Sequence, residues 1–125
     1  MYANDEFSKW LGIEIIKTGE GSCELKMKVR EEMTNGFKIA HGGITYSLAD
    51  SALAFASNSH GRQAVSVETS ISHTYKVVAG DILTAIAEEQ HRSDKIGVYQ
   101  IKVTNREDKI VAIFKGVVYR TQKDW

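Results

Sequence analysis

One continuous stretch of the 125-residue chain joins a glycine-containing loop to a long alanine-rich segment, and its pattern is that of a mostly buried helix. It runs from Asn35 to Asn58 as NGFKIAHGGITYSLADSALAFASN and contains no proline. On a helical wheel its apolar side chains share one arc, which consists of Ile44, Leu48, Ala49, Ala52, Leu53, Phe55 and Ala56. A helix with so broad an apolar arc is expected to be buried over most of its surface, so the rest of the chain is expected to pack around it.

Asp50 is the only acidic residue in this stretch. It falls on the other side of the predicted helix, together with Tyr46, Ala54 and Ser57. Burying an unpaired carboxylate is costly, so such groups are usually paired, hydrogen-bonded or functional. Asp50 is therefore a candidate functional residue, and the structural alternative is a carboxylate that pairs with a buried tyrosine or lysine.

Gly42 and Gly43 lie at the start of the predicted helix, where backbone N–H groups lack partners within the helix and carry partial positive charge. Such donors bind an anion or stabilise a developing oxyanion. The alternative is that the glycines only permit a tight turn. Asp50 lies about 10 Å along the helix axis from Gly43, too far for both to contact one substrate atom. Either Asp50 has an unrelated role, or it works with the helix start of another subunit, which predicts a two-fold dimer with sites at its interface.

The remaining elements read as one short helix and six strands. The helix covers residues 4–11 with Asn4 or Asp5 as its cap, and Gly61 is expected to end the long helix. The strands are predicted at Ile13–Thr18, at residues 23–29, and at Ala64–Lys76, Ile82–His91, Gly97–Thr104 and Ile110–Arg120. Short turns join the last four, which indicates antiparallel neighbours. This order predicts a single α+β domain over residues 1–125, in which a curved sheet wraps one long helix.

Two of the strand patterns carry further predictions. In Ala64–Lys76, strict alternation assigns Val65, Val67 and Ile71 to one face and places Ser66, Glu68 and Ser70 on the other. Residues 110–119 are apolar on both faces, so this strand is expected to be central in the sheet.

Composition narrows the possible functions. The formal net charge is zero, so nothing favours nucleic acid or an anionic membrane surface. No apolar run reaches the length of a membrane span, and the first ten residues lack the apolar region of a signal peptide, so a cytoplasmic location is expected. Cys23 is the only cysteine, which excludes an intrachain disulfide and argues against a zinc cluster. Neither a nucleophile elbow nor an HExxH motif is present, so we expect no serine triad, no metal and no separate cofactor.

Three segments with their spacing resemble the signature of the hotdog-fold thioesterases, in particular the phenylacetate-degradation (PaaI-type) branch. They are Asn35-Gly36, Ala40-His41-Gly42-Gly43 and Ser47-Leu48-Ala49-Asp50, and the similarity continues through Ala79-Gly80-Asp81, His91 and Gly97-Val98-Tyr99. The resemblance implies a hotdog fold and hydrolysis of acyl-coenzyme A (acyl-CoA) thioesters, with an aryl, phenylacetyl or medium-chain acyl group. It also implies a homodimer with sites at the interface, often paired again into a homotetramer.

The resemblance further implies roles for single residues. The N–H of Gly42, with Gly43 adjacent, is expected to polarise the thioester carbonyl. Asp50 of the partner subunit is expected to act either as nucleophile or as general base on water. Those two roles stay open at this point.

Three neighbouring residues complete the implied site. Asn35 is expected to orient it, and His41 to assist the thiolate leaving group or to hold the loop. Ser66 is the candidate hydroxyl for placing water. Glu68 beside it is unusual, and either changes the acyl preference or points to solvent.

Coenzyme A is part of the substrate rather than a cofactor, and its phosphates need cationic contacts. Lys76, His91, Arg92 and Lys95 lie at predicted strand ends and turns, where they are expected to gather on one rim; the alternative for each is a solvated surface. Gly97 is expected to let the pantetheine approach the backbone, or else to mark a bulge. Relatives commonly have a proline, often after an arginine, before the Gly-Asp turn, and this chain departs from them because it has no proline.

Two other functions are compatible with such a fold. A non-catalytic acyl-CoA binder or regulator would need the glycines but not Asp50, so the presence of both favours catalysis. A hydratase-type hotdog enzyme would need a histidine and an acid that meet at the site, which His41 and Asp50 could mimic. The spacing from Asn35 to Asp50 fits the thioesterase better.

Overall fold

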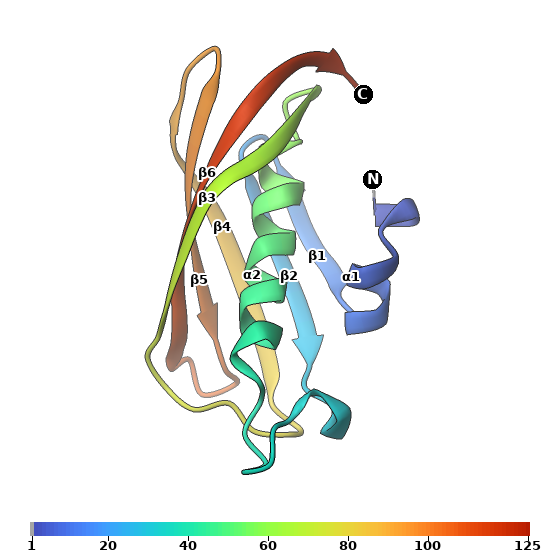
Figure 1. Ribbon diagram of the computed structural model, residues 1–125, viewed down its shortest axis with the longest axis vertical. Helices are drawn as coiled ribbons and strands as arrows, with labels where there is room; N and C mark the ends of the chain where they lie inside the picture. The colour runs from blue at the N-terminus through green and yellow to red at the C-terminus, as the bar shows by residue number, and fades with distance from the viewer. Residues whose placement is uncertain (1) are drawn as a thin grey trace.

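A curved antiparallel sheet wraps around one long helix, and two short helical segments at the N-terminus flank it (Figure 1). The structure is a computed structural model and describes residues 2–125. Its helical elements are η1 (Tyr2–Asn4), α1 (Glu6–Leu11), η2 (Glu31–Met33) and α2 (Gly42–Ser57). Its strands are β1 (Glu14–Gly19), β2 (Ser22–Lys28), β3 (Arg62–His73), β4 (Ile82–Arg92), β5 (Ile96–Thr104) and β6 (Ile110–Asp124). Apart from the short helical turns η1 and η2, this is the element order predicted from the sequence.

The six strands form one sheet in the order β1-β2-β4-β5-β6-β3, and all neighbouring strands are antiparallel. The predicted α+β hotdog arrangement is therefore confirmed. The strand β6 lies between β5 and β3, so it is an interior strand but not the central one. Because β3 comes last in this order, its outer backbone edge has no neighbour within residues 2–125.

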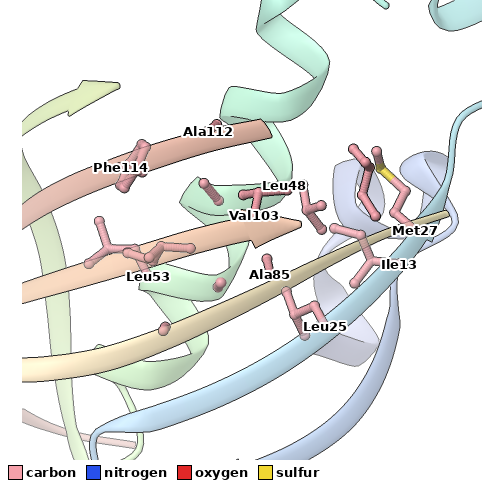
Figure 2. Close-up of a cluster of buried hydrophobic side chains, with 14 of the residues drawn as sticks. Ile13, Leu25, Met27, Leu48, Leu53, Ala85, Val103, Ala112 and Phe114 are labelled. Atoms are coloured by element: carbon pink, nitrogen blue, oxygen red, sulfur yellow. The ribbon is translucent and has the colours of Figure 1, made fainter. Parts of the chain in front are cut away.

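The core lies between α2 and the sheet. Leu48 and Leu53 of α2 point toward Ala85, Val103 and Phe114 on the strands (Figure 2). Small alanines on both surfaces let the helix approach the sheet closely. Gly116 of β6 marks one such close contact, because a methyl group there would overlap the Leu53 side chain. This close approach explains why the helix is rich in alanine where it faces the sheet.

The helix ends follow the capping rules, with one correction to the sequence prediction. Asp5 caps α1, since its carboxylate accepts the Ser8 N–H at 3.0 Å. The prediction that Gly61 ends the long helix is wrong: α2 ends at Ser57, and the Asn58 side chain donates to the Ala54 carbonyl at 2.8 Å. Within residues 2–125 the structure has no helix with the length and apolarity needed to cross a membrane.

The strict alternation predicted for β3 is interrupted. Its pairing with β6 shifts register between Ser66 and Glu68, which is a β-bulge. As a result Ser66 and Thr69 both face the helix, since Ser66 lines a cavity with α2 residues and the Thr69 hydroxyl bonds that of Tyr46. Val67, predicted to share a face with Ile71, is instead 61% exposed, and Val65 is 54% exposed.

Candidate active site

The loop that leads into α2 is held in place by its own backbone and by Asn35. The Asn35 side-chain oxygen accepts the N–H groups of Phe37 at 2.8 Å and Ile39 at 3.3 Å. The Ala40 N–H donates to the Val77 carbonyl at 2.7 Å, which ties the loop to the segment after β3. Asn35 therefore orders the loop that presents the helix start.

His41 is the N-cap of α2, and its ring accepts the Gly43 N–H through Nδ1 at 2.9 Å. The Ile44 N–H donates to the His41 carbonyl at 2.9 Å. The N–H of Gly42 has no hydrogen-bond partner among residues 2–125, as expected for the first residue of a helix. Of the two glycines singled out in the sequence, Gly42 therefore presents the free donor.

Asp50 lies two turns further along α2, on the side that faces β3, and is half-buried. It makes no hydrogen bond or ion pair with any other residue in the described part of the chain. The alternative of pairing with a buried tyrosine is not realised, since the Tyr46 hydroxyl bonds Thr69 at 2.5 Å. Burial raises the pKa of the Asp50 carboxyl above its ordinary value, and the negative charge of Asp5 adds to the shift.

Asp50 and Ser66 line a common cavity of about 60 Å³ between α2 and β3. A cavity of this size has room for ordered water, and the carboxylate and hydroxyl supply polar partners for it. The other lining side chains come mostly from small or apolar residues, among them Leu53 and Val118. The structure therefore brings together Asp50 and the hydroxyl that the sequence singled out, while Glu68 is exposed.

Asp50 and Gly42 do not meet within one chain. Asp50 follows Gly42 by eight residues, which is about 12 Å along a helix. The groups of the predicted site thus form two separate sets, the helix start with His41 and Asn35, and Asp50 with Ser66. Within residues 2–125, no cluster of three His, Cys, Asp or Glu side chains has a geometry suited to a metal ion.

The four cations expected to gather on one rim do not do so within one chain. Lys76 follows β3 at the end of the sheet where α2 begins (Figure 1). The other three, His91, Arg92 and Lys95, lie at the β4–β5 turn. An ion pair of 3.1 Å between Arg62 and Asp94 ties this turn to the start of β3, which follows the opposite end of α2. The 11 residues of β4 separate the two ends by about 36 Å.

Gly97 is buried, so the expectation that pantetheine approaches its backbone is wrong for this chain. A Cβ atom at this position would lie 3.0 Å from the Tyr99 ring and 3.0 Å from a methyl group of Val118, which fill the space beside the glycine. The bulge alternative also fails here, because the nearby register shift lies in β4, between Glu89 and His91.

Two features of the structure were not anticipated from the sequence. One is the Glu89 cluster, which consists of Glu89, His60 and Tyr99: a single Glu89 oxygen lies 2.8 Å from His60 Nε2 and 2.7 Å from the Tyr99 hydroxyl. It joins the loop after α2 to β4 and β5, far from the helix start. The other is His73, whose ring lies beside Gly42. Strict alternation places His73 on the face opposite Ser66, so no pattern in the sequence indicated its position beside Gly42.

The characteristic sequence pattern of the thioesterase superfamily matches residues 37–112 of this chain. The acyl-coenzyme A thioesterase PaaI of Escherichia coli is 43% identical over 120 residues, which cover 96% of this chain and 86% of that protein. A putative esterase of Archaeoglobus fulgidus is 39% identical over 125 residues, which cover all of this chain and 81% of that protein.

Solved structures also show a similarity to PaaI. The structure of the E. coli PaaI protein, from the phenylacetic acid degradation operon, superposes with a TM-score of 0.97 at 42% identity, and the match covers 99% of this chain and 90% of that one. A Streptococcus mutans protein, solved with acetyl-CoA bound, superposes with a TM-score of 0.87 at 25% identity over 90% of this chain and 91% of that one.

Proposed function

The chain belongs to the thioesterase superfamily, and we infer that it is an acyl-CoA thioesterase whose active site forms between two copies of the chain. It hydrolyses acyl-CoA thioesters to the free acid and CoA. One observation carries the proposal for the site: Asp50 is a half-buried carboxylate without a partner in its own chain, and it lies too far from the free N–H of Gly42 to act with it there.

We propose that two chains pair through their β3 edges in an antiparallel manner. An exposed edge strand offers a row of unpaired backbone groups, and Val65 and Val67 add apolar surface to this one. Such a pairing lays the two α2 helices side by side and antiparallel. The incompletely buried side of α2 carries the small residues Ser47 and Ala54, which supports a close approach of the helices around Asp50.

In this arrangement each Asp50 lies next to the partner's helix start. The thioester carbonyl oxygen accepts the N–H of Gly42, and the carboxylate of Asp50 acts from the other side of the carbonyl carbon. As a general base, Asp50 removes a proton from a water held near Ser66, and that water attacks. As a nucleophile, Asp50 forms an anhydride that water then hydrolyses. In both cases the carbon–sulfur bond breaks and CoA leaves as the thiol.

The same two-fold arrangement supports the cationic rim across two chains. The Arg62 end of one β3 strand then neighbours the His73 end of the other. The β4–β5 turn of one subunit, with Arg92 and Lys95, thereby comes toward Lys76 of its partner, where cations suit the CoA phosphates. We expect two such dimers to associate into a tetramer, which light scattering on the purified protein measures.

A thiol-release assay with a panel of acyl-CoA substrates tests the activity. We expect release with aryl, phenylacetyl or medium-chain substrates, and the Asp50→Ala variant should lower kcat by about a hundredfold or more. Binding of acyl-CoA without release by the wild-type protein would instead favour a non-catalytic binder.

Hybrid dimers test whether the site is shared. Asp50→Ala removes the carboxylate, and Gly42→Val keeps the backbone N–H but places a side chain beside it, where the His73 ring lies, so that a substrate cannot reach it. Each variant should therefore be inactive alone. After joint refolding, half of the dimers are mixed and one of their two sites is intact, so about a quarter of the wild-type activity should return. Co-refolded Asp50→Ala with Asp50→Asn is the matched control and should stay inactive. Failure of complementation by two folded variants would refute the shared site.

A further inference from the structure

His73, the last residue of β3, lies against the helix start. Its Nε2 atom is 3.3 Å, and its Cε1 atom 3.5 Å, from the position that a Cβ atom of Gly42 would occupy. The ring therefore covers the side of Gly42 that a side chain would otherwise fill. This puts an imidazole next to the one N–H of the helix start that has no partner among residues 2–125.

The imidazole of His73 is free to contact a substrate. It is exposed and makes no hydrogen bond or ion pair in the described part of the chain. Two other histidines differ from it: His41 uses Nδ1 to accept the Gly43 N–H, and His60 is bonded to Glu89. Only His73 combines an unengaged ring with a position beside Gly42.

The bulge in β3 is what directs His73 to this position. Ser66 lines the cavity with Asp50, and without the bulge the odd-numbered residues after it would face away from the helix. The extra residue brings Thr69 and then His73 onto the helix side, which is how β-bulges re-aim side chains next to active sites. The backbone there is fixed, since the Thr74 N–H donates to the Val111 carbonyl at 2.9 Å.

We propose that His73 is a catalytic residue that donates its Nε2–H to the thioester carbonyl oxygen, alongside the N–H of Gly42. This inference rests on the proposed function of the same site. The imidazole forms no covalent bond and keeps its proton throughout. The carbonyl oxygen gains negative charge when the carbon is attacked and loses it when the carbon–sulfur bond breaks. A fixed donor on that oxygen stabilises the charged intermediate more than the substrate, so it raises kcat rather than affinity.

Two substitutions separate donation from packing. His73→Phe keeps a ring beside Gly42 but removes the donor, and we expect kcat to fall about 10- to 100-fold while KM changes by less than about threefold. His73→Gln retains an N–H donor and should recover part of that loss. Ser72→Ala, at the preceding strand position, is the matched control and should keep wild-type kcat.

A binding measurement gives a readout that a structural role would not move. A CoA ketone, with a methylene in place of the thioester sulfur, retains the carbonyl, whereas an S-alkyl-CoA thioether does not. Because the ketone carbonyl is uncharged like that of the substrate, His73→Phe should weaken binding of the ketone relative to the thioether by at most about threefold, and His73→Gln should do so less.

The outcomes separate this inference from the function on which it rests. If the wild-type protein releases no thiol from any acyl-CoA, the proposed function fails. If the wild-type protein is active and Asp50→Ala is not, but His73→Phe keeps kcat within twofold, only the role of His73 is refuted. Equal losses in the Phe, Gln and Ser72→Ala variants would also refute it, because they would indicate a general disturbance of β3.

Discussion

Replacing Gly116 by alanine tests how closely α2 packs on the sheet. A Cβ atom at residue 116 would lie 2.8 Å from Leu53 Cδ1 and 3.1 Å from Leu53 Cγ, and closer still to Cδ2. Leu53 is 1% exposed, and the only open space recorded beside its side chain is the cavity of about 60 Å³ that it shares with Asp50. Overpacking of a core costs about 1 to 3 kcal/mol, and a contact with three atoms of one side chain belongs in the upper part of that range.

We therefore expect Gly116→Ala to lower the free energy of unfolding by about 2 to 3 kcal/mol. For a domain of this size the midpoint of thermal unfolding should fall by roughly 6 to 15 °C. Because Leu53 also lines the cavity that holds Asp50, kcat should fall as well. Denaturant unfolding at one fixed protein concentration is the appropriate assay, since association adds to the apparent stability.

A matched control and a double variant make the result decisive. Gly36→Ala is the control, because a Cβ atom there meets nothing within 4 Å, and its stability should change by less than about 1 kcal/mol. In a Leu53→Ala background the overlap is gone, so adding Gly116→Ala should cost almost nothing. A neutral effect of Gly116→Ala in the wild type, or an equal cost in both backgrounds, would refute the predicted overlap with Leu53.

Three further predictions concern the charge at the site, the edge strand and the Glu89 cluster. Asp50 must be ionised to act, and its pKa is raised, so kcat/KM should fall on the acid side at a pH above the ordinary aspartate pKa of 3.8. Asp5→Asn removes one cause of this shift, so a pH profile of kcat/KM for this variant should show the fall at a lower pH than in the wild type. Val67→Lys puts a charge on the exposed edge of β3 and should yield a folded monomer with little activity, measured by sedimentation velocity and thiol release; a fully active dimer would contradict the proposed pairing. Burial alone would raise the pKa of Glu89, but hydrogen bonds within its cluster hold that pKa below 4.5, so the carboxylate stabilises the fold above this pH. Glu89→Gln should lower the free energy of unfolding by about 1 to 2 kcal/mol at pH 7, and in denaturant unfolding the difference from wild type should narrow as the pH falls below 4.5.

The fold was predictable because its main elements carry strong periodic signals. The arc of Leu48, Ala52 and Ala56 specifies one buried helix, and the alternation from Cys23 to Lys28 specifies a strand with one buried face. Short turns then leave antiparallel pairing as the simple arrangement. These signals are local, and each one agrees with the fold as a whole.

The errors arose where position depends on distant parts of the chain. An inserted residue leaves no mark in an apolar pattern, so the bulge after Ser66 and the placement of His73 were not visible. What covers Gly97 depends on Tyr99 and on a residue of β6 that follows later in the chain. The separation of Lys76 from the β4–β5 turn was within reach, because an 11-residue strand is long enough to keep its two ends apart.

The spacing of Asp50 and Gly42 is the part of the site that the sequence defines best. Two groups that both contact one carbonyl group lie within about 6 Å of each other, because each contact is about 3 Å long. On one rigid helix these groups are about 12 Å apart, and the Gly42 donor belongs to the backbone, so no side-chain rotation closes the gap. In the proposed arrangement, a second chain brings the Asp50 carboxylate to the helix start. Dissociation of the dimer should therefore abolish turnover at every substrate concentration, rather than merely weaken the binding of acyl-CoA.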